Sequence, residues 1–501
     1  MSMQRLRRLY WVWFVFPKRA LFAIPGLLCA CASVAGAQQL ESTIQVIPSS
    51  AKVIVEGERA PVRVWSFRDS YAGVVGLGNR IERMTLFDDR GLEVTARKIA
   101  PGQFESARPA SRFRYEVNLT PPTQASDASR VSWLNSEHGL LMLADLLPVP
   151  ESAENKDPRQ NSAIIRFKTP AFCAVYSNEE EQPRGEFLIA DIDRGVFVVG
   201  THLRTSHASV SNMRLGLVTD GEWAFGDQDA LEMASQVLKA HRDVFGVMPA
   251  KDATLILFPF PESVSGNRWS AETRGTTVTL LMGKLPTKNS ALAALSVPLT
   301  HELFHFWVPN TLALTPDYEW FYEGFTIYQA ARTSVRLGLL TFQEFLNAIG
   351  RAYDAYAVVP DRDRWSLLEA SRRRWAGGEA VIYQKAMLIA LLYDLNLRSE
   401  SHGKRSLDDV YRELFRQGQR SAPQTDGNEA VINALNRVAG MNSFTESHVR
   451  RAAAVDLPAE LAPFGLQVER LGQRSRVSVN DQLSRQQRDL LRQLGYNDYR
   501  R

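Results

Sequence analysis

The first half of the chain carries short apolar runs that alternate with polar residues and are separated by Gly, Pro, Asn and Asp. The runs fall at residues 44–48, 63–67, 112–117, 163–167 and 195–200. A period of two between such residues predicts β-strands, and short strands at these intervals are typical of a sandwich. The pattern therefore predicts an N-terminal β-sandwich domain over residues 38–215. The polar segment 151–162 is expected to be an exposed loop.

From about residue 216 the apolar period changes to that of a helix. Residues 227–245 place apolar side chains on one face before Gly246, which predicts an amphipathic helix. His241 lies on that face and is interpreted as a hydrogen-bonded core histidine. Two strands are predicted next, at 254–258 and 276–282, with 266–275 as a loop between them. Helices then follow from Asn289 and over 340–356, 378–398, 406–416 and 428–439.

The helix that begins at Asn289 carries the candidate chemistry, His301-Glu302-Leu303-Phe304-His305. Two histidines four residues apart share one helix face and can bind one tetrahedral metal ion. Glu302 points aside and is free to act as a general base. The flanking residues are apolar, so burying these two imidazoles without a hydrogen-bond or metal partner would cost free energy. The alternative is a core helix whose histidines bond to backbone carbonyls.

A catalytic zinc needs three protein ligands and one open position. Thr311 stands six residues after the second histidine, where a metzincin has its third. Glu323 in WFYEGFTIY, at the start of a second predicted helix, is the candidate instead. Asp317 and Glu319 precede that helix and are expected to cap its N-terminus.

The segments THELFHFW and WFYEGFTIY resemble the glycyl aminopeptidase family of gluzincins, relatives of aminopeptidase N and more distantly of thermolysin. The resemblance implies one Zn²⁺ held by His301, His305 and Glu323, with Glu302 as the general base. It also implies an α+β multidomain fold, in which the β-sandwich precedes a thermolysin-like zincin core over 216–336 and a helical lobe over 337–457. Seventeen residues separate His305 from Glu323, one fewer than in the aminopeptidase N branch.

Two further positions follow from the resemblance. Tyr383-Gln384-Lys385 matches the family's Y-x-K-G element, whose tyrosine stabilises the oxyanion, although Ala386 replaces the glycine; a tyrosine on the rim of an amphipathic helix is the alternative. Glu272 corresponds to the glutamate that holds the substrate's α-amino group, with a solvated glutamate as the alternative. Strand 276–282 is expected to be the edge strand that binds the peptide backbone.

Other polar residues receive structural interpretations. Asp394 and Arg398 are spaced as a helix ion pair. Arg372-Arg373-Arg374 is interpreted as a solvated charged face, with a substrate-carboxylate site as the alternative. No second ligand residue stands at metal-binding spacing from His138, His202 or His207. These histidines are therefore interpreted as ordinary polar or turn residues. Residues 458–501 are expected to be a polar tail, where many family members continue into a PDZ domain.

The N-terminus predicts export. Basic residues, an apolar run from Ala20 and Ala35-Gly36-Ala37 are typical of a signal peptide over residues 1–37, too short for a stable membrane span. A lipoprotein signal around Cys29 and Cys31 is the alternative. Of 59 Lys and Arg, five lie in this segment, which leaves 54 against 55 Asp and Glu and gives no reason to expect nucleic acid as a partner. Once this segment is removed, Cys173 is the one cysteine left, so no internal disulfide is expected.

These patterns predict an exported, periplasmic zinc metallopeptidase that acts on peptides. The family implies an aminopeptidase preferring small N-terminal residues. Two alternatives remain at this point: an endopeptidase with the same zinc mechanism, and a non-catalytic periplasmic binding or scaffold protein on a peptidase fold. The sequence does not predict an oligomeric state.

Overall fold

The computed structural model describes residues 39–149, 161–312, 314–315, 317–360, 362–418 and 425–497. The predicted signal peptide, and the polar loop at 151–160, lie outside the described residues. The remainder from Gln39 onward forms one unit by its internal contacts.

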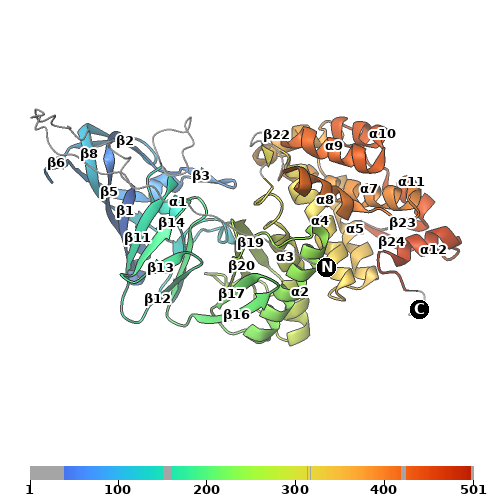
Figure 1. Cartoon of the computed structure of the whole chain (residues 1–501), viewed down its shortest axis with the longest axis horizontal. Helices are drawn as coiled ribbons and strands as arrows, with labels where there is room; N and C mark the ends of the chain where they lie inside the picture. The colour runs from blue at the N-terminus through green and yellow to red at the C-terminus, as the bar shows by residue number, and fades with distance from the viewer. Residues whose placement is uncertain are drawn as a thin grey trace, which may run out of the picture. The chain divides into compact units, whose positions relative to one another are not determined.

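The N-terminal domain is a sandwich of two sheets (Figure 1). The larger has the order β13-β14-β11-β1-β2-β8-β5-β6, with β7 also paired to β8, and the smaller has the order β12-β15-β10-β9. Their strands are β1 Leu40–Ile47, β2 Lys52–Ser66, β5 Ile81–Phe87, β6 Glu93–Val94, β7 Ala96–Ala100, β8 Gln103–Asn118, β9 Trp133–Leu134, β10 His138–Met142, β11 Ala163–Lys168, β12 Ala174–Ser177, β13 Glu180–Gln182, β14 Glu186–Ile189 and β15 Val196–Gly200.

One apolar core joins the two sheets, because alternate residues of both face it. Ile44 and Val55 of the large sheet pack with Leu141 and Phe197 of the small one, all fully or almost fully buried. This packing confirms the predicted sandwich. A hairpin of β3 Ser70–Tyr71 and β4 Val74–Val75 projects from the same domain, and the short helix α1 Leu143–Leu146 follows β10.

A five-stranded sheet, β16-β17-β18-β20-β19, supports the second domain. Its strands are β16 Arg204–Val210, β17 Met213–Thr219, β18 Asp252–Pro259, β19 Trp269–Arg274 and β20 Thr277–Met282. Because β17 pairs in parallel with β18, β16 and the start of β17 belong here rather than to the sandwich, where the boundary at residue 215 placed them. The small sheet of the sandwich packs on this sheet through Met142, Val198, Ile256 and Phe258.

Two expectations about this sheet were wrong. The predicted loop 266–275 contains strand β19, and β19 rather than the 276–282 strand is the edge of the sheet. β20 lies inside the sheet and is buried along its whole length. β19 escaped prediction because its buried residues, Ser270 and Arg274, are polar while Trp269 is exposed, so it has no apolar period.

Helices cover the five-stranded sheet and form the rest of the chain (Figure 1). Thr287 caps helix α3 by accepting a hydrogen bond from the Ser290 amide. The helices are α2 Asp227–Phe245, α3 Lys288–Phe304, α4 Thr326–Arg336, α5 Phe342–Ala357, α6 Leu367–Arg372, α7 Ala386–Glu400, α8 Leu407–Gly418, α9 Gly427–Ala439 and α10 Asn442–Thr445. Two short strands, β21 Leu314–Thr315 and β22 Thr425–Asp426, pair in parallel among them. Two π-helical turns, η5 Trp320–Phe325 and η7 Val381–Lys385, precede α4 and α7.

The predicted polar tail is folded up to residue 497. It contains α11 Leu457–Leu461, the hairpin β23 Leu466–Leu471 and β24 Arg474–Val479, and α12 Arg485–Arg492. Strand β24 packs on α5, and the Ser475 amide donates to both carboxylate oxygens of Asp354 at 3.0 and 2.9 Å. Apolar residues of this segment, among them Val477 and Leu491, join the main core. Polar residues outnumber them, which is why composition alone suggested a tail.

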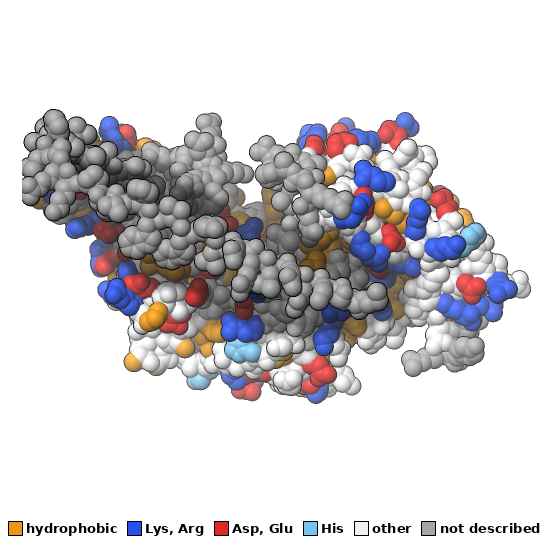
Figure 2. Space-filling model, viewed as in Figure 1, with side chains coloured by type: hydrophobic (Ala, Val, Ile, Leu, Met, Phe, Trp, Pro, Cys, Tyr) orange, Lys and Arg blue, Asp and Glu red, His pale blue; other side chains and the backbone are white. Residues whose placement is uncertain are grey.

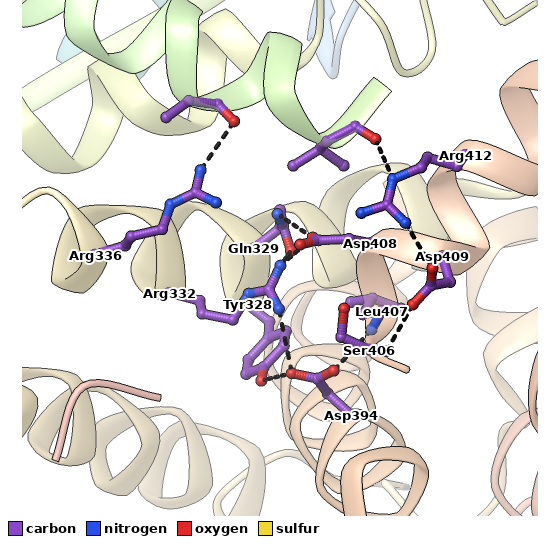
Figure 3. Close-up of polar contacts among 12 residues, drawn as sticks. Tyr328, Gln329, Arg332, Arg336, Asp394, Ser406, Leu407, Asp408, Asp409 and Arg412 are labelled. Carbon is purple, nitrogen blue, oxygen red and sulfur yellow. Dashed lines mark hydrogen bonds and ion pairs between the residues drawn. The ribbon is translucent and has the colours of Figure 1, made fainter. Parts of the chain in front are cut away.

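A buried polar network joins α4, α7 and α8 (Figure 3). Fully buried Asp394 accepts hydrogen bonds from Tyr328 Oη at 2.6 Å, Arg398 Nε at 2.9 Å and the Leu407 amide at 2.7 Å. Arg332 points between Asp394 and Asp408 and pairs with both. The predicted structural pair of Asp394 and Arg398 is therefore confirmed, as part of a larger network.

Charged side chains of both signs are interspersed on the described surface visible in Figure 2. Within the described residues, no helix combines the length and hydrophobicity needed to cross a bilayer.

Candidate active site

Helix α3 brings two imidazoles together at its C-terminal end. The Nε2 atoms of His301 and His305 lie 3.0 Å apart, in nearly buried side chains. His305 Nδ1 is 2.8 Å from the carbonyl oxygen of Val308, to which it can donate. That bond fixes the tautomer in which Nε2 carries the free lone pair, as is usual for a metal-binding histidine.

Glu323 completes a three-atom ligand set. Its Oε2 lies 3.4 Å from Nε2 of His301 and 3.6 Å from Nε2 of His305. Ligand atoms bound to one tetrahedral zinc at about 2.0–2.1 Å are about 3.3 Å apart. The spacing of these three atoms therefore fits a zinc ion. Glu302 also has a carboxylate oxygen within 4.8 Å of the imidazole nitrogens, so its own contacts must be considered.

The carboxylate of Glu302 is held from the opposite side by β19. Thr273 Oγ1 donates to Glu302 Oε2 at 2.6 Å, and also lies 3.2 Å from the Glu302 carbonyl. Glu302 is buried within the cavity described below. A carboxylate steered by a hydroxyl, beside rather than within the ligand set, suits a general base.

Electrostatics favour the ionised form of Glu323. Burial opposes ionisation, but the two imidazoles and the Arg374 guanidinium hold the pKa of Glu323 well below its usual value. Burial likewise opposes protonation of His305, yet pairing with Glu323 raises its pKa to about 9. A metal ion would therefore compete with a proton for this imidazole.

Tyr383 stands on the π-turn η7, next to the turn that carries Glu323. Burial and the nearby Glu323 charge raise the pKa of Tyr383 well above its usual value, so the hydroxyl keeps its proton. Gly324 permits this closeness: a Cβ there would lie 2.3 Å from the Cβ of Ala386 and 2.5 Å from the carbonyl of Ile382. π-turns are often found at functional sites.

Arg374 links the two turns. Its NH2 donates to Glu323 Oε1 at 2.9 Å and to Tyr383 Oη at 2.7 Å. Arg372 and Arg373 are exposed, as expected for a solvated face, but Arg374 is not. The expectation was therefore wrong for one residue of the three. The arginine run was the only sequence signal, and it does not show which member turns inward.

Glu272 lies on the edge strand β19. Its Oε1 accepts a 2.6 Å hydrogen bond from the hydroxyl of Tyr71 on the β3–β4 hairpin. The guanidinium of Arg274 stacks on the Tyr71 ring, 4.1 Å from its centroid. Burial raises the pKa of Glu272, an effect that Arg274 and the Tyr71 hydroxyl oppose. Tyr71 is a residue that sequence analysis missed.

A single cavity of about 1170 Å³ brings these groups together. It is lined by Glu272, Thr273, the histidine pair, Glu302, Glu323, Arg374 and Tyr383. The β3–β4 hairpin contacts two residues that line this cavity. The carbonyl oxygen of Ala72 accepts a hydrogen bond from Arg130, and Gly73 packs against the ring of Trp375. Tyr71, Ala72 and Trp375 also line the cavity. The hairpin thus borders the cavity on the side where Glu272 lies.

The other histidines lie outside this cavity. His138 Nδ1 pairs with Asp220 Oδ2 at 2.9 Å, and His241 Nε2 lies 2.9 Å from the carbonyl of Thr300. His241 is therefore the hydrogen-bonded core residue predicted from its helix face. Glu319 stands at the N-cap position expected for it, but its side chain makes no cap hydrogen bond and lines the cavity instead.

Comparison with known proteins agrees with this geometry. Residues 295–389, which include every proposed ligand and Tyr383, match the M61 glycyl aminopeptidase family. The fold resembles an aminopeptidase N family protein from Idiomarina loihiensis, with a TM-score of 0.74 and 19% identity over 86% of this chain and 79% of that one. The family match over residues 295–389 and the shared fold together support a zinc metallopeptidase of the gluzincin type. No curated protein sequence matches it significantly.

A second group of solved structures also resembles this chain in fold. The M1 zinc metallopeptidase from Deinococcus radiodurans matches with a TM-score of 0.54 and 14% identity, over 84% of this chain and 95% of that one. A mutant of that enzyme was solved with a Tyr-Ser-Ala substrate and matches equally well. In this protein, Ala386 lies against Gly324, so the close approach of the two π-turns depends on the glycine at 324.

Proposed function

We propose that this protein is a zinc-dependent aminopeptidase of the gluzincin type in which Glu272 binds the α-amino group of the peptide. The supporting observation is the place of Glu272: a carboxylate on the edge strand, in the same cavity as the metal-ligand set, on the side bordered by the hairpin. A carboxylate there attracts an ammonium group. A border on that side leaves little room for residues preceding the scissile bond, which favours exopeptidase action.

His301, His305 and Glu323 would hold the zinc, which when bound supplies Lewis-acid activation of the carbonyl and a nucleophilic water at neutral pH. Glu302, oriented by Thr273, takes the proton of the attacking water and passes it to the leaving amine. Tyr383 donates its O–H to the carbonyl oxygen as that oxygen gains charge. The free edge of β19 pairs with the peptide backbone as an added strand.

Metal analysis tests the first part of this proposal. We expect about one zinc per chain in the wild-type protein and its loss in His305→Ala. Glu302→Gln should retain zinc but lose about 10²- to 10⁴-fold in kcat, the usual range for a general base. A protein that binds no zinc, or a Glu302→Gln variant with unchanged hydrolysis, would favour the scaffold alternative.

Blocked and free peptides test the second part. Wild-type enzyme should cleave a peptide with a free α-amine and not its N-acetylated form. Glu272→Gln, which keeps a hydrogen-bonding group without charge, should lose most of this discrimination and raise KM for the free peptide. Equal cleavage of both peptides by the wild type would contradict the amine site and support the endopeptidase alternative.

Export to the bacterial periplasm is also proposed, on the composition of residues 1–37 alone. Fractionation of cells producing the full chain with a C-terminal tag should place a shortened product in the periplasm. A full-length product in the cytoplasm would contradict the proposal.

A further inference from the structure

We propose that Arg374 is a positioning residue that orients the third metal ligand, Glu323, and the oxyanion donor, Tyr383, through a single guanidinium. The inference deepens the proposed function and rests on it. It concerns a residue that the arginine run had suggested to be solvated.

The hydrogen-bond directions follow from the chemistry of arginine. A guanidinium has five N–H donors and no acceptor. Its NH2 group carries two hydrogens, and two acceptors lie within reach, Glu323 Oε1 at 2.9 Å and Tyr383 Oη at 2.7 Å. NH1 donates in the same way to Tyr322 Oη at 3.1 Å. Because Arg374 can only donate, the Tyr383 oxygen must accept.

This fixes what Tyr383 can do. Once its oxygen accepts from Arg374, its own hydrogen must point to a different partner. Tyr383 lines the cavity that holds the ligand set, and its hydroxyl remains protonated because burial disfavours the phenolate. Arg374 therefore leaves the Tyr383 proton available for the carbonyl oxygen of a substrate, where an oxyanion donor is needed.

The same guanidinium decides which oxygen of Glu323 faces the metal. Oε1 is occupied by Arg374, while Oε2 lies 3.4 and 3.6 Å from the two imidazole nitrogens. The carboxylate is thus oriented for ligation through Oε2 alone. Removing an outer partner of a metal ligand typically costs 10- to 100-fold in metal affinity.

Arg374 is itself held in place. Its guanidinium carbon lies 4.7 Å from the ring centroid of Trp375, 5.6 Å from that of Tyr383 and 6.0 Å from that of Tyr322. The side chain is only 14% exposed. A planar fork matches this arrangement of two acceptors and stacked rings, whereas the ammonium of lysine does not.

The test compares Arg374→Ala with Arg372→Ala, an exposed neighbour that serves as the matched control. Zinc affinity is measured by chelator competition, and kinetics are then measured at saturating zinc. We expect Arg374→Ala to weaken zinc binding 10- to 100-fold and to lower kcat at least about 10-fold, with KM for the free peptide nearly unchanged. Arg372→Ala should change neither. A rise in KM with unchanged kcat would instead support the substrate-carboxylate alternative and overturn the proposal.

Two further arms separate positioning from a merely structural role. Millimolar guanidinium should restore part of the kcat of Arg374→Ala, whereas sodium chloride at the same concentration should not. Tyr383→Phe should lower kcat without weakening zinc binding, and combining it with Arg374→Ala should cost less than the product of the two single effects. Additive losses together with no rescue would overturn the inference. If the wild type hydrolyses no peptide, the proposed function fails. The zinc affinities of the wild type and Arg374→Ala still test whether Arg374 orients Glu323 as a metal ligand.

Discussion

At the scale of single residues, three glutamates in one cavity differ by the donor that each one meets. Glu323 meets a guanidinium, Glu302 a threonine hydroxyl and Glu272 a tyrosine hydroxyl. The charged donor favours an ionised ligand, while a neutral donor fixes orientation without neutralising the charge. The partners, rather than the glutamates themselves, distinguish the three proposed roles. The resemblance names the glutamates but not these partners, because Thr273 lies 29 residues from Glu302 in the chain and Tyr71 lies 201 residues from Glu272.

Thr273 offers a direct test of this assignment. Thr273→Val removes the hydroxyl that holds Glu302 Oε2 and keeps the side-chain shape. We expect kcat to fall about 10-fold, the loss of roughly one hydrogen bond to a charged group, with zinc content unchanged. Thr273→Ser, which keeps the hydroxyl, is the control and should retain most of the activity. Steady-state kinetics with a free peptide and metal analysis make the comparison; equal kcat for the valine and serine variants would rule out the orienting role.

At the scale of elements, the helix period predicted α2 with its observed bounds and placed the histidine pair on a helix. It did not predict that Glu323 and Tyr383 lie on π-turns. A one-residue difference in spacing before Glu323 could have turned its side chain by about 100° on an α-helix. The structure shows Glu323 on a π-turn and facing the imidazoles nonetheless. No local propensity marks such a turn, because it is stabilised by packing against its neighbour.

Gly324 is where that packing is tightest. In Gly324→Ala, the new methyl group would meet both the Ala386 side chain and the Ile382 backbone, so the two π-turns must separate. We expect a loss of about 1–3 kcal/mol in the free energy of unfolding, the usual cost of overpacking, together with weaker zinc binding. Urea unfolding and chelator competition measure the two effects.

A matched control lies in the helix α5. Gly350 also lies against a backbone carbonyl, that of Ser475, and is not itself among the residues that line the cavity. Gly350→Ala should destabilise the protein without weakening zinc binding. If both alanine variants affect zinc binding equally, the packing at Gly324 has no special link to the ligand set.

At the scale of the whole molecule, apolar patterning predicted the order of the domains, but it misplaced one pair of strands and missed one long-range contact. Strands β16 and β17 have the same period as sandwich strands, and only their pairing with β18 assigns them to the catalytic sheet. The hairpin that carries Tyr71 reaches a glutamate 201 positions later in the chain. Contacts at such separation leave no local signal, and a single sequence cannot reveal them.

His241 joins the two central helices α2 and α3, and it makes global stability sensitive to acid. It is fully buried, and its Nε2 lies 2.9 Å from the carbonyl of Thr300. Burial lowers the pKa of His241 from 6.5 to about 4. Between these two values the unfolded chain binds more protons than the folded one, so the free energy of unfolding falls as pH decreases through this window. The contribution lost by pH 4.5 is about 2–3 kcal/mol.

His241→Gln removes the titration and keeps an amide that can donate to Thr300. In urea unfolding of the metal-free protein, held in chelator so that zinc release does not contribute, the wild type should lose about 2–3 kcal/mol more than this variant between pH 7.5 and pH 4.5. Above pH 7 the two proteins should show the same dependence on pH, because His241 is then neutral in both states. Parallel curves over the whole pH range would contradict this prediction. They would mean that the His241 imidazole is protonated as easily in the folded protein as in the unfolded chain, contrary to the effect expected from its burial between α2 and α3.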